Sequence, residues 1–131
     1  MRDHPVSVMI VEDEFIVALE LKGRLETMGY RVVAAATSAP EAVDMVPAVK
    51  PDVVLLDIRL GEGLDGIDAA GAIKARFGVP IIFVTAHFDR ETVSRAVVVE
   101  PSDYVLKPIR DHDLRSAIEA AVAAPVKHPT L

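Results

Sequence analysis

The chain has 131 residues, of which 20 are acidic and 14 are basic, so its net charge at pH 7 is −6. Hydrophobic residues make up 51% of the sequence, which excludes an intrinsically disordered chain because disorder requires low hydrophobicity. The negative charge argues against direct binding to nucleic acid through its phosphates, since such binding requires a surplus of Lys and Arg.

Cysteine is absent, which excludes disulfides, thiolate zinc sites and cysteine nucleophiles. The longest early apolar run, Val8–Val11, is followed by Glu12 and is too short for a signal peptide or a membrane span. We therefore expect a single soluble domain in the cytoplasm, with no membrane partner.

Five short apolar runs, most of them rich in β-branched residues, alternate with longer segments. Such nearly continuous runs are typical of strands that are buried on both faces of a parallel sheet. The predicted strands are Val6–Val11, Arg31–Ala35, Val53–Leu56, Ile81–Val84 and Tyr104–Leu106.

The segments between these runs have the signals of helices. The first helix carries one apolar stripe and ends at Gly29; the stripe is formed by Val17, Leu21, Leu25 and Met28. Ser38 and Glu41 form a capping box that opens the second helix. Pro47 and Pro51 then limit that helix.

The third helix is predicted over Gly66–Phe77, and the fourth begins near Asp89 and ends before Pro101. The fifth helix follows Pro108, with Asp111 as its expected N-cap. Five strands that alternate with five helices predict an α/β fold, in which a doubly wound parallel sheet carries helices on both faces.

In such a sheet the functional residues lie just beyond the carboxyl ends of the strands. Glu12 and Asp13 follow the first strand, Asp57 the third, Thr85 the fourth and Lys107 the fifth. We therefore expect three carboxylates, a hydroxyl group and an ammonium group to meet at one edge of the sheet.

These groups would carry a net charge of −2, which a divalent cation would neutralise. Oxygen ligands without cysteine or clustered histidine favour Mg²⁺ (or Mn²⁺) over zinc. Such a constellation suits the transfer of a phosphoryl group, with Asp57 as the nucleophile. Mg²⁺ and Lys107 would neutralise the phosphoryl oxygens, and Thr85 would donate a hydrogen bond to one of them.

Five motifs with these residues, in this order and at these separations, resemble the receiver domain of two-component response regulators. The resemblance extends from about Val6 to Ala123. The motifs are Met9-Ile10-Val11-Glu12-Asp13-Glu14, Val53-Val54-Leu55-Leu56-Asp57, Asp65-Gly66, Val84-Thr85-Ala86 and Tyr104-Val105-Leu106-Lys107-Pro108.

The resemblance implies a flavodoxin-like sheet with strand order 2-1-3-4-5, a receiver domain over residues 1–124, and a short tail over 125–131 without an effector domain. It implies that Asp57 accepts a phosphoryl group from the phosphohistidine of a sensor histidine kinase. Asp13, Asp57 and the backbone carbonyl of Arg59 would ligate Mg²⁺, while Glu12 would act through a metal-bound water. Lys107 would contact the phosphoryl group.

The same resemblance implies a switch made of Thr85 and Tyr104, and a cis bond between Lys107 and Pro108. The output surface would be the fourth helix, the fifth strand and the fifth helix, through which a homodimer could also form. The expected partners are a sensor kinase and either a downstream protein or a histidine phosphotransfer protein. No enzymatic activity is expected beyond promotion of the domain's own phosphorylation and dephosphorylation.

Two positions near the acceptor vary in this family, and here they are Arg59 and His87. We expect these bulky side chains to shield the phosphorylated Asp57 from water and to slow its hydrolysis.

Two alternative functions have less support. A haloacid-dehalogenase-type phosphatase also uses an aspartyl phosphate, but it carries a second acid where this chain has Arg59, and its nucleophile ends the first strand. A flavodoxin-like cofactor binder lacks support, because no glycine-rich phosphate loop follows the first strand.

The run Val97-Val98-Val99 has two interpretations of similar weight. Either the fourth helix ends early and the run packs under the following loop, or the run is part of a partner surface.

Overall fold

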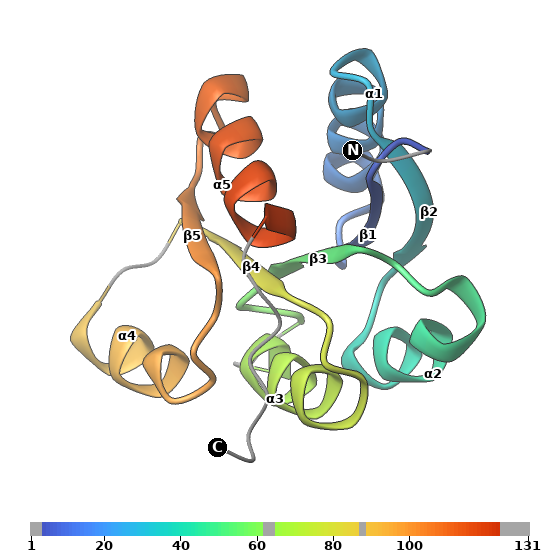
Figure 1. The fold of residues 1–131 in the computed structure, drawn as a ribbon. Helices are drawn as coiled ribbons and strands as arrows, with labels where there is room; N and C mark the ends of the chain where they lie inside the picture. The colour runs from blue at the N-terminus through green and yellow to red at the C-terminus, as the bar shows by residue number, and fades with distance from the viewer. Residues whose placement is uncertain (1–3, 62–64, 87–88, 124–131) are drawn as a thin grey trace.

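The computed structural model describes residues 4–61, 65–86 and 89–123, with the exception of the Asp65 side chain. Five parallel strands form one sheet in the order β2-β1-β3-β4-β5 (Figure 1). The strands are β1 (Ser7–Val11), β2 (Arg31–Ala36), β3 (Val53–Asp57), β4 (Ile81–Thr85) and β5 (Asp103–Leu106). The helices are α1 (Phe15–Thr27), α2 (Ala39–Val49), α3 (Asp65–Phe77), α4 (Arg90–Val97) and α5 (Asp111–Ala123). The predicted fold class and strand order are confirmed.

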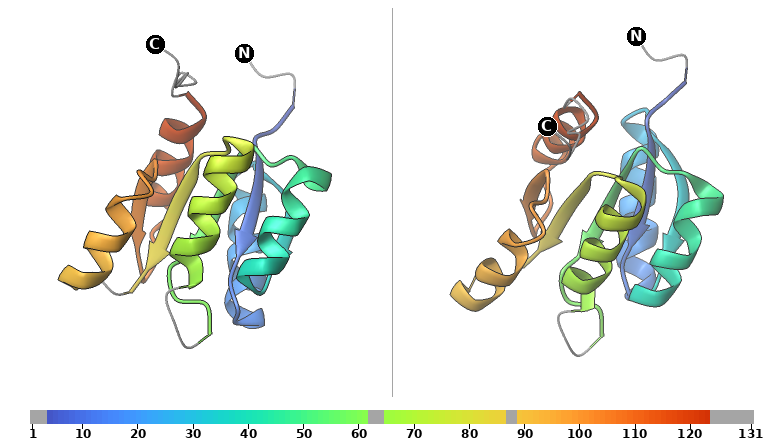
Figure 2. Two further views of the ribbon diagram at one scale, coloured as in Figure 1. Left: turned by 90° about the horizontal axis from the view of Figure 1, so that it is seen from below. Right: turned by 60° about the horizontal axis from the view of Figure 1, so that its bottom comes forward.

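Helices α1 and α5 cover one face of the sheet, and α2, α3 and α4 lie side by side on the other (Figures 1 and 2). Alternate residues of β1 enter the two cores: Val8 and Ile10 pack toward α1 and α5, while Met9 and Val11 pack toward the other three helices. Every residue of the central strands β3 and β4 is buried, which explains their continuous apolar runs.

Helix α1 ends where the sequence predicts, just before Gly29. Leu21 and Leu25 of the predicted stripe are buried, and Gly29 has a φ of +97°, which favours glycine because it lacks a Cβ atom. Gly29 therefore ends α1 as predicted.

The beginning of α2 is capped as predicted, since the Ser38 hydroxyl accepts a hydrogen bond from the amide of Glu41 at 3.3 Å. The Glu41 carboxylate reaches back to the amide of Thr37 at 2.7 Å, one residue before the cap. The prediction that Pro47 limits this helix is wrong, because Pro47 lies inside the last turn of α2. Pro47 lacks the N–H of one helical hydrogen bond, but the helix continues through it to Val49, and the left-handed Lys50 ends the helix before Pro51.

The beginning of α5 differs by one residue from its prediction. Asp111 is the first residue of the helix rather than its N-cap. One oxygen of its carboxylate accepts two hydrogen bonds from Arg24 of α1.

The fourth helix is capped by Asp89, whose carboxylate accepts a hydrogen bond from the Thr92 amide at 2.8 Å. The helix ends at Val97, and Val99 packs against the core, as the first interpretation of the valine run predicts. That interpretation does not hold for Val97 and Val98, which are 53% and 80% exposed.

Among the described residues, no helix combines the length and the apolar character that crossing a membrane requires.

Candidate functional site

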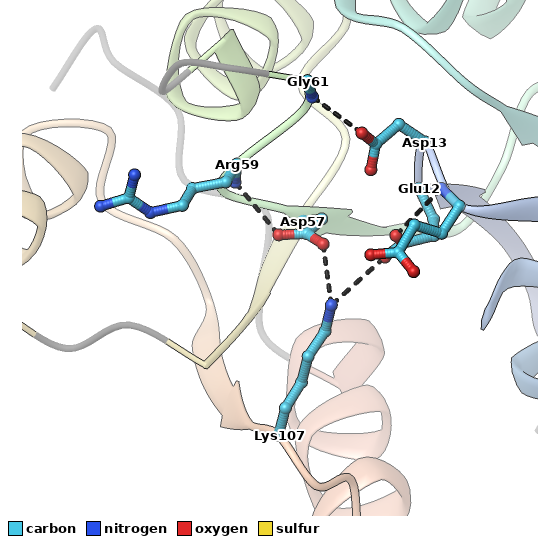
Figure 3. Close-up of polar contacts among 7 residues, drawn as sticks. Glu12, Asp13, Asp57, Arg59, Gly61 and Lys107 are labelled. Atoms are coloured by element: carbon cyan, nitrogen blue, oxygen red, sulfur yellow. Dashed lines mark hydrogen bonds and ion pairs between the residues drawn. The ribbon is translucent and has the colours of Figure 1, made fainter.

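The acidic residues converge because β1 and β3 are neighbours that end at the same edge of the sheet. Val11 of β1 is paired with Leu56 of β3, so Glu12 and Asp13 follow β1 beside Asp57, the last residue of β3. Lys107 reaches the same place from the end of β5 (Figure 3).

The Asp57 carboxylate lies at the centre of this group, and residue Asp57 is only 8% exposed. Lys107 Nζ donates to one carboxylate oxygen of Asp57 at 2.8 Å, and the backbone amide of Arg59 donates to the other at 3.0 Å. Both oxygens are thus held in a fixed orientation, with a cation on one side.

Glu12 is more deeply buried than Asp57, at 4% exposure. Its carboxylate lies 3.4 Å from Lys107 Nζ and accepts a hydrogen bond from the Glu14 amide at 3.2 Å. Burial is the main cause that raises the pKa of Glu12 to about 7, and a hydrogen bond to Asp57 and the negative charge of Asp57 add to it. The positive charge of Lys107 and the hydrogen bond from the Glu14 amide lower the pKa of Glu12 but do not outweigh these causes.

Burial by itself would lower the pKa of Lys107, because it disfavours the charged form. The hydrogen bonds and negative charges of Asp57 and Glu12 outweigh this effect and raise the pKa of Lys107 above its ordinary value. The amine therefore stays charged and balances part of the acidic cluster.

Asp13 differs from its two neighbours because its side chain is exposed. One of its carboxylate oxygens accepts a hydrogen bond from the backbone amide of Gly61 at 2.9 Å. This contact ties the loop after β3 to the end of β1 (Figure 3).

Glu12, Asp13 and Asp57 each offer a carboxylate oxygen that lies within 4.8 Å of the other two. Three carboxylates this close, with solvent access through Asp13, fit a hard divalent cation that keeps several waters. The cluster fits Mg²⁺ or Mn²⁺, and the carbonyl ligand expected at Arg59 stays a prediction.

Gly66 has a structural role at the beginning of α3 that its motif did not reveal. A Cβ atom at this position would lie 2.0 Å from the carbonyl oxygen of Asp57 and 2.6 Å from that of Ile58. The Gly66 amide donates to the same Ile58 carbonyl at 3.1 Å. The helix can therefore approach the end of β3 this closely because residue 66 is glycine.

The two residues expected to form the switch occupy neighbouring strands. Thr85 is buried at the end of β4, and its backbone carbonyl accepts a hydrogen bond from the Lys107 amide at 2.9 Å. Tyr104 is half-buried on β5 and packs on Phe83 with 5.9 Å between ring centroids, and burial raises the pKa of Tyr104. The movement of Thr85 and Tyr104 stays a prediction.

Of the two residues expected to shield Asp57, the structure describes only Arg59. His87 lies outside the described residues. The Arg59 side chain extends away from Asp57 (Figure 3). Its guanidinium lies 3.8 Å from the Asp89 carboxylate. The shielding role stays a prediction for both residues.

Comparison with protein families gives a match to the response regulator receiver domain over residues 8–119. The transcriptional regulatory protein PdtaR of Mycobacterium tuberculosis is 38% identical over 119 residues, which cover 91% of this chain and 58% of PdtaR. The phyllosphere-induced regulator PhyR of Methylorubrum extorquens is 31% identical over 121 residues, which cover 92% of this chain and 45% of PhyR. The chain thus spans about half the length of these curated relatives.

Solved structures agree with this match. The signal receiver domain of a modulated diguanylate cyclase from Desulfovibrio desulfuricans superposes with a TM-score of 0.85 at 40% identity, covering 92% of this chain and 95% of that one. A CheY-like receiver domain protein from Methanospirillum hungatei has a TM-score of 0.79 at 27% identity, covering 91% of this chain and 94% of that one.

Proposed function

The chain belongs to the family of response regulator receiver domains, and we propose that Asp57 is its phosphoacceptor. The observation that carries this assignment is the 2.8 Å contact between the buried Asp57 carboxylate and Lys107 Nζ, beside the carboxylates of Glu12 and Asp13. A nucleophilic carboxylate, a fixed cation and a metal-binding cluster around one point suit phosphoryl transfer.

The proposed donor is a phosphohistidine of a sensor histidine kinase. A carboxylate oxygen of Asp57 attacks the phosphorus atom, the P–N bond breaks, and the leaving imidazole nitrogen takes a proton from solvent. Hydrolysis of the acyl phosphate by water restores the carboxylate. The domain would thus promote its own phosphorylation and dephosphorylation and would have no other enzymatic activity.

The chain's own groups act in this step by orientation and charge. The Arg59 amide holds one carboxylate oxygen of Asp57 in place. The positive Lys107 amine, which contacts the other oxygen, stabilises the negative charge of the incoming phosphoryl group. Asp13, Asp57 and the Arg59 carbonyl would hold Mg²⁺ directly, with Glu12 acting through water. When bound, that ion would neutralise part of the negative charge on the phosphoryl oxygens.

On phosphorylation, Thr85 and Tyr104 would move and so change the surface formed by α4, β5 and α5. Val97, Val98 and Leu106 are large apolar residues of this surface with more than half of their area exposed. A downstream protein, a histidine phosphotransfer protein or a second copy of the domain would bind there. The absence of cysteine fits a protein of the reducing cytoplasm.

Transfer from a panel of autophosphorylated sensor kinases tests this function. The proposal predicts that at least one kinase loses its label rapidly to this protein, and that Asp57→Asn accepts none. A protein that takes no label from any kinase in a panel covering its own genome contradicts the proposal.

The substrates that the protein turns over distinguish the proposed function from that of a haloacid-dehalogenase-type phosphatase. Arg59 stands where that family carries its second acid, and Asp57 ends the third strand instead of the first. The comparisons give the alternative no support. Steady turnover of a generic phosphomonoester would favour it, whereas a receiver domain should show almost none.

A further inference from the structure

Arg24 of α1 contacts the loop that carries Lys107, although it lies outside the acidic cluster. Its Nη2 donates to the backbone carbonyl of Ile109 at 2.7 Å. Its Nε and Nη2 donate to one carboxylate oxygen of Asp111 at 2.9 and 2.6 Å. One half-buried guanidinium therefore binds both the main chain of this loop and the first turn of α5.

The two ends of the loop are thus anchored independently. The Lys107 amide donates to the Thr85 carbonyl at 2.9 Å, which fixes the start of the loop to β4. Arg24 fixes the loop two residues later, at Ile109. Between these anchors the chain has little freedom, so the direction in which the Lys107 side chain leaves the backbone is set.

We propose that Arg24 is a positioning residue for Lys107, which holds the β5–α5 loop so that the Lys107 amine reaches the phosphoryl group on Asp57. This inference rests on the proposed function of Asp57. A lysine side chain has many rotamers, and its catalytic value depends on the backbone that aims it. The planar guanidinium binds two different acceptors at once, which a lysine amine at position 24 would not reproduce.

The proposal makes a selective prediction, because the backbone that carries the three carboxylates lies at the ends of β1 and β3 and not in this loop. Glu12 and Asp13 follow β1, and Asp57 ends β3, so all three keep their places when the Arg24 contacts are lost. Loss of Arg24 should therefore impair phosphoryl transfer without weakening Mg²⁺ binding, because a displaced Lys107 amine takes a positive charge away from the carboxylates.

Arg115 of α5 provides a matched control. Its Nη2 donates to the backbone carbonyl of Met28 at 3.3 Å, and its guanidinium lies 5.7 Å from the centre of the Tyr30 ring. Arg115 thus joins the end of α1 to α5 through an arginine–carbonyl contact, and neither of these two contacts involves the loop that carries Lys107.

The test compares Arg24→Gln, Arg24→Lys and Arg115→Gln with the wild type. Mg²⁺ affinity is measured by calorimetry, and the rate of labelling by acetyl phosphate is measured at saturating Mg²⁺. We expect Arg24→Gln to be labelled about tenfold more slowly, within the ~100-fold that a misplacement of one ångström can cost. Arg24→Lys should not restore the rate, and Arg115→Gln should keep it.

A double-mutant cycle with Lys107→Ala shows whether Arg24 acts through Lys107. Arg24→Gln should slow labelling in the wild-type background and add nothing in the Lys107→Ala background. Hydrogen exchange gives a readout independent of phosphorylation, since the Lys107 amide should exchange faster in Arg24→Gln than in Arg115→Gln.

An unchanged labelling rate in Arg24→Gln would overturn the inference, as would a parallel loss of Mg²⁺ affinity or an equal slowing in the Lys107→Ala background. These outcomes presuppose that the wild type is labelled. A wild type that takes no label from acetyl phosphate would overturn the proposed function itself, and so distinguishes the two failures.

Discussion

The guanidinium of Arg59 lies 3.8 Å from the carboxylate of Asp89, the residue that caps the N-terminus of α4. The backbone amide of Arg59 also donates to Asp57 at 3.0 Å. A single residue therefore contacts both the proposed acceptor and the N-cap of a helix on the proposed output surface.

The two partners of this ion pair should differ in their effect on stability. Asp89→Ala removes the cap of α4, whereas Arg59→Ala removes only an exposed ion pair, which contributes little. We expect a clear decrease in the urea midpoint for Asp89→Ala and almost none for Arg59→Ala. Asp89→Asn, which can still accept the Thr92 hydrogen bond, is the control. Equal effects of Asp89→Ala and Arg59→Ala would contradict the assignment of Asp89 as a cap.

The acyl phosphate should decay faster when the acceptor loses the side chains expected to shield it. Arg59→Ala and His87→Ala should each shorten the phosphoryl half-life, because water then reaches phosphorylated Asp57 more readily. The measurement is the decay of the labelled protein after the donor has been removed. If neither variant decays faster than the wild type, Arg59 and His87 do not shield the acceptor.

The raised pKa of Glu12 should make the stability of the metal-free protein depend on pH. A carboxyl group whose pKa rises on folding from 4.5 to about 7 contributes stability that is fully present below the lower value. That contribution is lost as the pH rises through the higher value. Glu12→Gln carries no titrating carboxyl group, so its stability should not show this decline.

The comparison uses urea unfolding of the wild type and Glu12→Gln at several pH values, with a chelator present. The free energy of unfolding of the wild type, relative to Glu12→Gln, should fall between pH 4.5 and about 7. Two curves that stay parallel over this range would show that the pKa of Glu12 is not raised in the folded protein.

Two glycines inside helices should respond oppositely to alanine. Gly66→Ala places a Cβ atom 2.0 Å from the Asp57 carbonyl oxygen, so β3 or α3 must shift. Gly23→Ala in α1 meets no atom within 4 Å, and alanine favours the helix by about 1 kcal/mol over glycine. Thermal unfolding should show a lower midpoint for Gly66→Ala and a higher one for Gly23→Ala. A Gly66→Ala protein as stable as the wild type would contradict the close approach.

The places of Glu12, Asp13, Asp57 and Lys107 could be predicted because they follow strands directly along the chain. Once the apolar runs are taken as parallel strands, the sheet itself brings their carboxyl ends to one edge. Gly29 and Ser38 were predictable for a similar reason, since each acts within a few residues of its own position.

The contacts that sequence did not reveal join distant parts of the chain. Asp13 binds the amide of Gly61, 48 residues later, and Arg24 binds Asp111, 87 residues later. Local periodicity carries no information on such pairs, and a charged residue on a helix usually predicts only an exposed surface. The failure at Pro47 has another cause, because the apolar face of α2 continues past the proline, with Val46 buried and Val49 packed on the core, and such packing outweighs local propensity.

Labelling with acetyl phosphate and Mg²⁺ tests the acceptor assignment most directly, with the product measured by intact mass and by peptide mapping. The wild type should gain the mass of one phosphoryl group, located at Asp57 and removed by hydroxylamine, and Asp57→Asn should gain none. Full labelling of Asp57→Asn under the same conditions would contradict the assignment.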